Sequence, residues 1–193
     1  MLEVDDAGWG DLLDGVVLGF LRVEDSAFLV KVIDVKFFHK PFFAEKLYLD
    51  EAAKLAHEAL KELKTKKSEE IRICTAPVLE KVRKTLADEG YKVTPAKIVG
   101  ELQVKVEAAF VDRLEKMGVE EGSVPLEPCR DRFYAQLRWI HEDLTNREKY
   151  VKTAWKSWKR WRNWRMRRRP VSRSRVRKVR RTDGERVEDW WSW

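Results

Sequence analysis

Two adjacent carboxylates near the start of the chain are the residues best suited to chemistry. Asp5 and Asp6 follow a short apolar run and precede a glycine-containing turn, Ala7-Gly8-Trp9-Gly10. Carboxylate oxygens are good ligands for Mg²⁺ and Mn²⁺, and paired divalent cations can promote phosphodiester cleavage. The pair therefore predicts a site for Mg²⁺ or Mn²⁺ at a strand end. The alternative is that the two aspartates only belong to the glycine turn and bind no metal ion.

Carboxylates on a later predicted helix could complete such a site. Glu101 and Asp112 both lie in the segment that follows Gly100. Eleven residues separate them, so on a helix they share one face roughly 16 Å apart and cannot both reach one metal pair. Either Asp112 or Glu101 is therefore expected to be the ligand, and Asp14 and Glu107 are further candidates.

The period of the apolar residues predicts the elements that position these carboxylates. Strands are expected at 2–6, 16–23, 28–38, 71–74 and 91–99, with helices at about 47–65, from 77 to 90 and from 100 to 118. Three consecutive strands followed by alternating helices and strands predict an α/β fold, with a mixed five-stranded sheet flanked by helices.

The opening segment, VDDAGWGDLLDGVVLGFLRV, resembles the first motif of type 2 ribonuclease H. In that family an Asp and a Glu end the first strand, and Asp5 and Asp6 fall on them. The segment from Gly100 to Leu114 is similar to the family's helix that ends in Arg-Asp-Arg, with Asp112 and Arg113 on its last two residues. The resemblance covers roughly residues 1–118. It implies a ribonuclease-H-like fold and a nuclease that needs Mg²⁺ or Mn²⁺.

The chain departs from this family at three positions. Asp6 is one methylene shorter than the family's Glu, and Trp9 replaces the Arg of its glycine turn. The fourth strand ends Ile73-Cys74-Thr75, where the family has an Asp. The departures leave two hypotheses open. One is a divalent-metal-dependent nuclease acting on RNA or RNA-containing nucleic acid, and the other is a non-catalytic RNA-binding or ribonucleoprotein-assembly subunit.

Charge is distributed very unevenly. The whole chain has a net charge of +7, yet residues 149–181 contain 16 Lys and Arg residues and no Asp or Glu. Trp155, Trp158, Trp161 and Trp164 recur there every three residues. Tryptophan rings stack on bases, and basic side chains neutralise phosphates, so the segment predicts RNA binding in preference to duplex DNA. Docking of the rings on protein and binding to a membrane surface are the alternatives. The predicted nucleic-acid ligands are Trp155, Lys156, Trp158, Lys159, Arg160, Trp161, Arg162, Trp164, Arg165, Arg167, Arg168 and Arg169.

The predicted organisation has three parts: a ribonuclease-H-like domain at 1–118, a connector and docking helix at 119–148, and a basic Trp-rich arm at 149–193. Within the connector, Phe133, Leu137, Ile140 and Leu144 form one apolar stripe. Thr145 to Glu148 matches a capping box, so a further helix is expected from there to Pro170. The closing Trp190, Trp191 and Trp193 are a possible contact for a protein partner.

Composition limits the remaining function classes. The start has neither the basic nor the apolar region of a signal peptide, and no apolar run approaches the roughly 18 residues of a membrane span, so a cytoplasmic protein is expected. Two cysteines make no disulfide framework, and no zinc-type ligand spacing occurs. A charged content of 38% with few Asn and Gln is typical of proteins from hot environments.

Overall fold

The computed structural model describes residues 1–119, 129–156 and 158–163. The chain divides into two compact units, residues 1–155 and 156–193. The strands of the first unit are β1 (Leu2–Ala7), β2 (Val16–Arg22), β3 (Ala27–Ile33), β4 (Glu70–Cys74) and β5 (Lys92–Ala96). Its helices are η1 (Val35–Phe38), α1 (Leu47–Glu62), η2 (Pro77–Leu79), α2 (Glu80–Asp88), α3 (Glu101–Lys116), α4 (Cys129–Glu142), α5 (Leu144–Arg147) and η3 (Glu148–Tyr150). The second unit contributes α6 (Trp158–Arg162).

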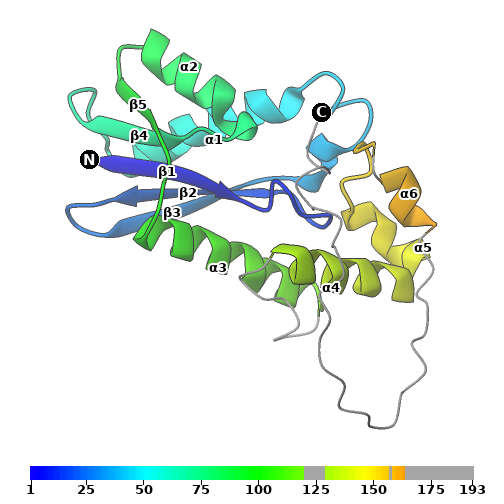
Figure 1. Cartoon of the computed structure of the whole chain (residues 1–193). Coiled ribbons are helices and arrows are strands. Elements are labelled where there is room, and N and C mark those ends of the chain that lie inside the picture. Colours follow the sequence, from blue (N-terminus) through cyan, green and yellow to red (C-terminus); the bar gives the residue numbers. More distant parts are fainter. Residues whose placement is uncertain (120–128, 157, 164–193) are drawn as a thin grey trace, which may run out of the picture. The chain divides into compact units, whose positions relative to one another are not determined.

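The predicted α/β fold class is confirmed. The five strands form one mixed sheet in the order β3-β2-β1-β4-β5. β1 is antiparallel to β2 and parallel to β4, and β4 is parallel to β5. Helices α1 and α2 lie on one side of the sheet and α3 on the other (Figure 1). β1 is therefore the central strand, as expected for the strand that carries Asp5.

The core explains why these segments adopt their structures. Alternate residues of the strands, among them Leu2, Val4, Leu18 and Phe20, are fully buried and join the apolar faces of α1 and α2 in one cluster. On α3, every fourth residue from Leu102 to Leu114 is buried, which gives that helix one apolar stripe. Both faces of the central strand are thus covered, and its carboxyl end is held in place from two sides.

Three predicted elements differ clearly from those observed. The strand predicted at 91–99 is β5, which ends at Ala96. β3 ends at Ile33 instead of 38, because the Asp34 side chain accepts a hydrogen bond from the Lys36 backbone N–H and caps the 3-10 helix η1. The prediction of a helix that begins at Thr145 and continues to Pro170 is wrong. Asp143 caps the short helix α5, and the chain is extended again at Val151.

The boundary of the predicted arm is also displaced. Val151 forms a β-bridge with Leu13, and the Lys152 backbone N–H donates to the Leu12 carbonyl at 2.9 Å. Residues 149–155 therefore belong to the first unit, and the division falls after Trp155 instead of after residue 148. Among the residues that the structure describes, no helix combines the length and the apolar character needed to cross a membrane.

Candidate metal centre

The two carboxylates at the end of β1 meet a thiol at the end of β4. Asp5 is 6% exposed, and Asp6 is partly buried beside it. The parallel register pairs Val4 with Ile73, so the next residue of β4, Cys74, lies against Asp5. One ligand atom each from Asp5, Asp6 and Cys74 can be chosen so that all three lie within 4.8 Å of one another. In the described part of the chain, this is the one group of three or more such residues close enough to hold a metal ion.

Burial makes this cluster costly to charge. It raises the pKa of Asp5, and it raises the pKa of Asp6 to about 7, with further contributions from the charges of Asp5 and Glu107. Burial also raises the pKa of the Cys74 thiol to about 12. Cys74 is therefore protonated at neutral pH, and its thiol is hydrogen-bonded to the Asp5 carboxylate.

The helix α3 brings Glu107, a further candidate from the sequence, close enough to act on Asp6, instead of Glu101 or Asp112, one of which was expected to be the ligand. The charge of Glu107 raises the pKa of Asp6, and burial raises the pKa of Glu107 itself. The structure does not bring Asp112 or Glu101 into the cluster. Both are exposed and form i,i+4 ion pairs on the helix surface, Asp112 with Lys116 at 2.6 Å and Glu101 with Lys105 at 2.7 Å.

The helical phase explains this difference. Phe110 lies on the buried stripe of α3, and Glu107 precedes it by three residues, which is about 60° around the helix. Asp112 follows Phe110 by two residues, about 200° around, and so faces away from the sheet. The stripe was visible in the sequence, and its phase could have selected Glu107.

Three buried polar side chains from beyond the core sheet hold the turn that follows the acidic pair. Arg132 of α4 makes two hydrogen bonds to the Asp11 carboxylate, at 2.9 and 2.8 Å, and a third to Glu107 at 2.6 Å. Gln136, one helical turn later, donates to Asp11 and accepts from the backbone N–H groups of Leu12 and Leu13. The turn is therefore fixed to α4 by both charge and backbone contacts.

Lys152 is the third of these side chains and is fully buried. Its ammonium donates to the backbone carbonyls of Gly8 and Asp11, and it lies 5.3 Å from the centre of the Phe38 ring. Burial lowers the pKa of Lys152 to about 8, while the neighbouring carboxylates Asp11, Asp14 and Asp6 favour its charged form. Asp14, a further sequence candidate, is bound by Arg113 at 2.5 and 3.0 Å instead of facing the cluster.

Gly8 allows the turn to approach α3 closely, and this leads to a stability prediction. Gly8 and Gly90 both have φ of +86°, but an added Cβ at Gly8 would lie 2.4 Å from the Phe110 ring, whereas at Gly90 nothing lies within 4 Å. Gly90→Ala is expected to cost about 1–2 kcal/mol of unfolding free energy through backbone strain alone. Gly8→Ala is expected to cost about 1–3 kcal/mol more, because the ring must move. Urea unfolding of the two variants measures this difference, and equal losses would contradict the close approach.

The predicted nucleic-acid ligands fall into two groups. Trp155, Trp158 and Trp161 are each less than 5% exposed, which favours packing over open stacking on bases. Lys156, Lys159, Arg160 and Arg162 are exposed. The remaining ones lie outside the described residues, as do the C-terminal tryptophans of the possible protein contact: Trp164, Arg165, Arg167, Arg168, Arg169, Trp190, Trp191 and Trp193.

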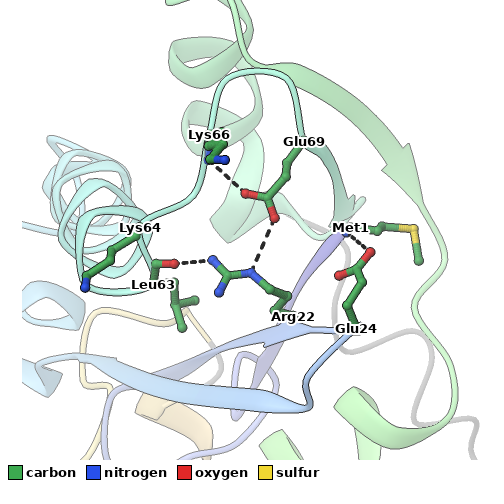
Figure 2. Close-up of a pocket in the computed structure, with 7 residues that line it drawn as sticks. All are labelled: Met1, Arg22, Glu24, Leu63, Lys64, Lys66 and Glu69. Atoms are coloured by element: carbon green, nitrogen blue, oxygen red, sulfur yellow. Dashed lines mark hydrogen bonds and ion pairs between the residues drawn. The ribbon is translucent and has the colours of Figure 1, made fainter.

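A separate pocket of about 460 Å³ lies at the opposite end of the central strand from the acids. Figure 2 shows Arg22 at its centre, bound to Glu69 at 3.3 Å and to the Leu63 carbonyl, while the amino group of Met1 is bound to Glu24. Arg22 is thus paired with Glu69, and the amino group of Met1 with Glu24. The pocket offers no nucleophile or cluster of metal ligands, so the acidic cluster remains the better candidate site.

Comparisons with known proteins leave this geometry as the main guide to function. No protein-family model matches the chain, and no curated protein matches it.

Proposed function

We propose that the chain is a divalent-metal-dependent phosphodiesterase of the ribonuclease-H-like kind, acting on RNA or RNA-containing nucleic acid. The observation that carries the proposal is the convergence of Asp5, Asp6 and Cys74 at the carboxyl ends of two parallel strands in the middle of the sheet. The sheet order and the antiparallel β1–β2–β3 meander agree with the fold that the resemblance to type 2 ribonuclease H implies.

The donor set fits one divalent cation. Asp5 and Asp6 supply hard oxygen ligands, and Cys74 supplies a softer sulfur ligand once it has lost its proton. Both Mn²⁺ and Mg²⁺ prefer oxygen ligands, but Mn²⁺ accepts a sulfur ligand more readily than Mg²⁺ does. A cation bound there would acidify a coordinated water and neutralise charge on a phosphate. A further carboxylate that acts on Asp6, that of Glu107, is bound by Arg132 at 2.6 Å.

The residues around the cluster have positioning roles in this proposal. Arg83 of α2 donates to the backbone carbonyls of Cys74 and Ala76, which fixes the end of β4 beside Asp5. Lys152 fixes the Gly8–Asp11 turn at the end of β1. Both cations also lower the pKa of Asp6, which favours the ionised ligand. The ends of the two strands are thus held independently of any bound ion.

A second candidate function is a non-catalytic RNA-binding or ribonucleoprotein-assembly subunit. The strand end where a fourth-strand acid is expected, Ile73-Cys74-Thr75, carries none, and the Cys74 thiol beside Asp5 is protonated at neutral pH. In addition, Arg132 and Lys152 already supply positive charge to the acidic turn. These two observations favour a fold that has replaced bound cations by its own side chains.

The exposed basic residues after residue 155 are proposed to add affinity for nucleic acid through phosphate contacts. Because Trp155, Trp158 and Trp161 are buried, we attribute this affinity to the basic side chains more than to stacking of the rings on bases. We propose RNA as the ligand in preference to duplex DNA. We also propose that Trp190, Trp191 and Trp193 contact a protein partner and that the protein acts in the cytoplasm.

Metal binding separates the two candidates. Titration calorimetry should detect one Mn²⁺ per chain, and Mn²⁺ should support cleavage of an RNA substrate. Asp5→Asn should abolish both, because no neighbour replaces the lost charge. Asp112→Asn is the matched control and should leave both unchanged, since its carboxylate is exposed and pairs with Lys116. A wild-type chain that binds RNA without binding Mn²⁺ would support the non-catalytic function instead.

A further inference from the structure

An exposed aromatic and basic surface lies beside the turn of the candidate site. It is formed by Phe37, Phe42 and three exposed lysines, and we refer to it as the Phe42 platform. Phe42 is 40% exposed, and its ring lies 6.3 Å from the partly buried ring of Phe37. The lysines are Lys36, Lys40 and Lys46.

The segment that forms the platform carries a net positive charge. Within residues 35–46 the single acidic residue is Glu45, against the three lysines. Lys36 places its ammonium 5.2 Å from the centre of the Phe37 ring, so an aromatic face and a cation are already combined there. Such a surface complements a ligand that carries both flat bases and phosphates.

The platform stands on a rigid base. Phe38, Phe43 and Tyr48 stack beneath it, with Tyr48 5.7 Å from Phe38 and 5.3 Å from Phe43. Backbone hydrogen bonds close the loop above them, from Phe43 to the His39 carbonyl and from Leu47 to the Phe42 carbonyl. The backbone of the platform therefore has little conformational freedom to lose on binding, which favours affinity.

The same aromatic base connects the platform to the acidic cluster. Trp9 follows Asp6 by three residues, and its ring lies 5.4 Å from Tyr48 and 6.1 Å from Phe38. On the other side, the His39 ring is hydrogen-bonded to the Val151 carbonyl at 2.8 Å, next to Lys152. The platform and the carboxyl end of β1 therefore lie at the same end of the sheet, as Figure 1 shows.

We propose that the Phe42 platform binds unpaired bases of a single-stranded RNA segment, with Lys36, Lys40 and Lys46 contacting its phosphates. Unpaired bases expose their faces for stacking, whereas the bases of a duplex are already stacked on one another. The proposal rests on the proposed function for its relevance to cleavage, and names single-stranded RNA as the ligand. Binding to the platform itself requires no metal ion.

Binding measurements on the full chain test the platform. Fluorescence anisotropy with a labelled oligouridylate is carried out in EDTA, so that no cleavage occurs. Phe42→Leu keeps an apolar side chain but removes the flat ring, and about a ten-fold weaker Kd is expected, as for the loss of one stacked base. Val104→Ala is the control, since Val104 is also an exposed apolar residue but lies on α3.

The lysines are tested through the dependence of the Kd on salt. In Lys36→Gln/Lys40→Gln the slope of log K against log salt should fall by about 1.4, because each phosphate that a lysine neutralises on a single strand contributes roughly 0.7 to that slope. Lys92→Gln/Lys97→Gln is the charge-matched control at two exposed positions in and after β5 and should leave the slope unchanged.

Crosslinking locates the bound RNA directly. An oligouridylate with 5-iodouracil should form adducts at Phe37 or Phe42. An unchanged Kd for Phe42→Leu, or an equal loss of affinity for duplex RNA, would overturn the proposal, as would adducts confined to residues 149–193. These outcomes are independent of Mn²⁺ binding, which tests the proposed function by itself.

Discussion

Replacement of Arg132 by methionine is expected to lower the free energy of unfolding by about 3–5 kcal/mol. Arg132 is 2% exposed and holds Asp11, which is 4% exposed, through two hydrogen bonds. Without the guanidinium, the Asp11 carboxylate stays buried with only Gln136 among the side-chain donors of the described residues, and Glu107 loses its 2.6 Å partner. The cost is large because the buried Asp11 carboxylate loses two charged hydrogen bonds, and the nearby Lys152 ammonium offsets its charge only in part.

Arg113→Met is the matched control for that experiment. Arg113 also makes a two-fold contact with a turn carboxylate, Asp14, but its own side chain is 39% exposed. The Asp14 side chain left behind is only 10% exposed, but the Arg113 side of the contact is open to water, so the loss is expected to be smaller than for Arg132→Met, about 1–2 kcal/mol. Urea unfolding of both variants measures the difference. Comparable losses for Arg132→Met and Arg113→Met would show that the Asp11 pair is not isolated from solvent.

The sheet was predictable because its signals are local. Strands of five to seven residues with apolar residues at alternate positions, and helices with one apolar stripe, can each be recognised from a few consecutive residues. The order of elements then fixes a mixed sheet, and the parallel pairing of β1 with β4 follows from the helix between them. Asp5 at the end of the central strand was predicted on the same basis.

The side chains around the site were less predictable, because their burial depends on contacts between distant segments. Nothing near Lys152 distinguishes it from the other basic residues of 149–181, yet it is fully buried against a turn about 140 residues earlier in the chain. Arg132 lies about 80° around the helix from the nearest residue of the predicted apolar stripe, where a solvated arginine is the usual outcome. Its partner Asp11 lies in a turn that local patterns treat as exposed.

The end of the fourth strand was predicted only in part. The sequence shows that no acid follows Ile73, but it gives no role to the cysteine in that place. The register brings Cys74 against Asp5 as a hydrogen-bonded thiol and a potential sulfur ligand. That role depends on burial at a shared strand end, which the sequence specifies only once the parallel pairing is known.

Stability should depend on pH through Asp6, and this is the second large effect. Burial and the charges of Asp5 and Glu107 raise the pKa of Asp6 to about 7 in the folded chain, against 3.8 for the ordinary side chain. Between these values the folded state keeps a proton that the unfolded state has lost. Stability therefore falls as pH rises from about 4 to about 7, by up to roughly 4 kcal/mol at 1.36 kcal/mol per pKa unit.

Asp6→Asn isolates this contribution, because asparagine keeps nearly the same shape and cannot ionise. In EDTA, the variant is expected to be more stable than the wild type at pH 8 and similar to it at pH 4, with a flatter profile between. The charges that act on the Asp6 pKa explain the sign, since Lys152 and Arg83 offset the effects of burial and of the neighbouring carboxylates only in part. Asp112→Asn should follow the wild-type profile, because Asp112 is exposed.

Mn²⁺ links this profile to the proposed function. A cation between Asp5 and Asp6 would compensate the ionised carboxylates, so Mn²⁺ should raise the stability of the wild type at pH 8 and have much less effect at pH 4, where Asp6 is protonated. The Asp6→Asn variant should gain much less, because it lacks one ligand. For each protein, urea unfolding at both pH values, with Mn²⁺ and with EDTA, measures the free energy of unfolding under these four conditions. A wild-type chain equally stable at pH 4 and pH 8 in EDTA would contradict the buried charge of Asp6, and a Mn²⁺ effect that survives Asp6→Asn would place the cation elsewhere.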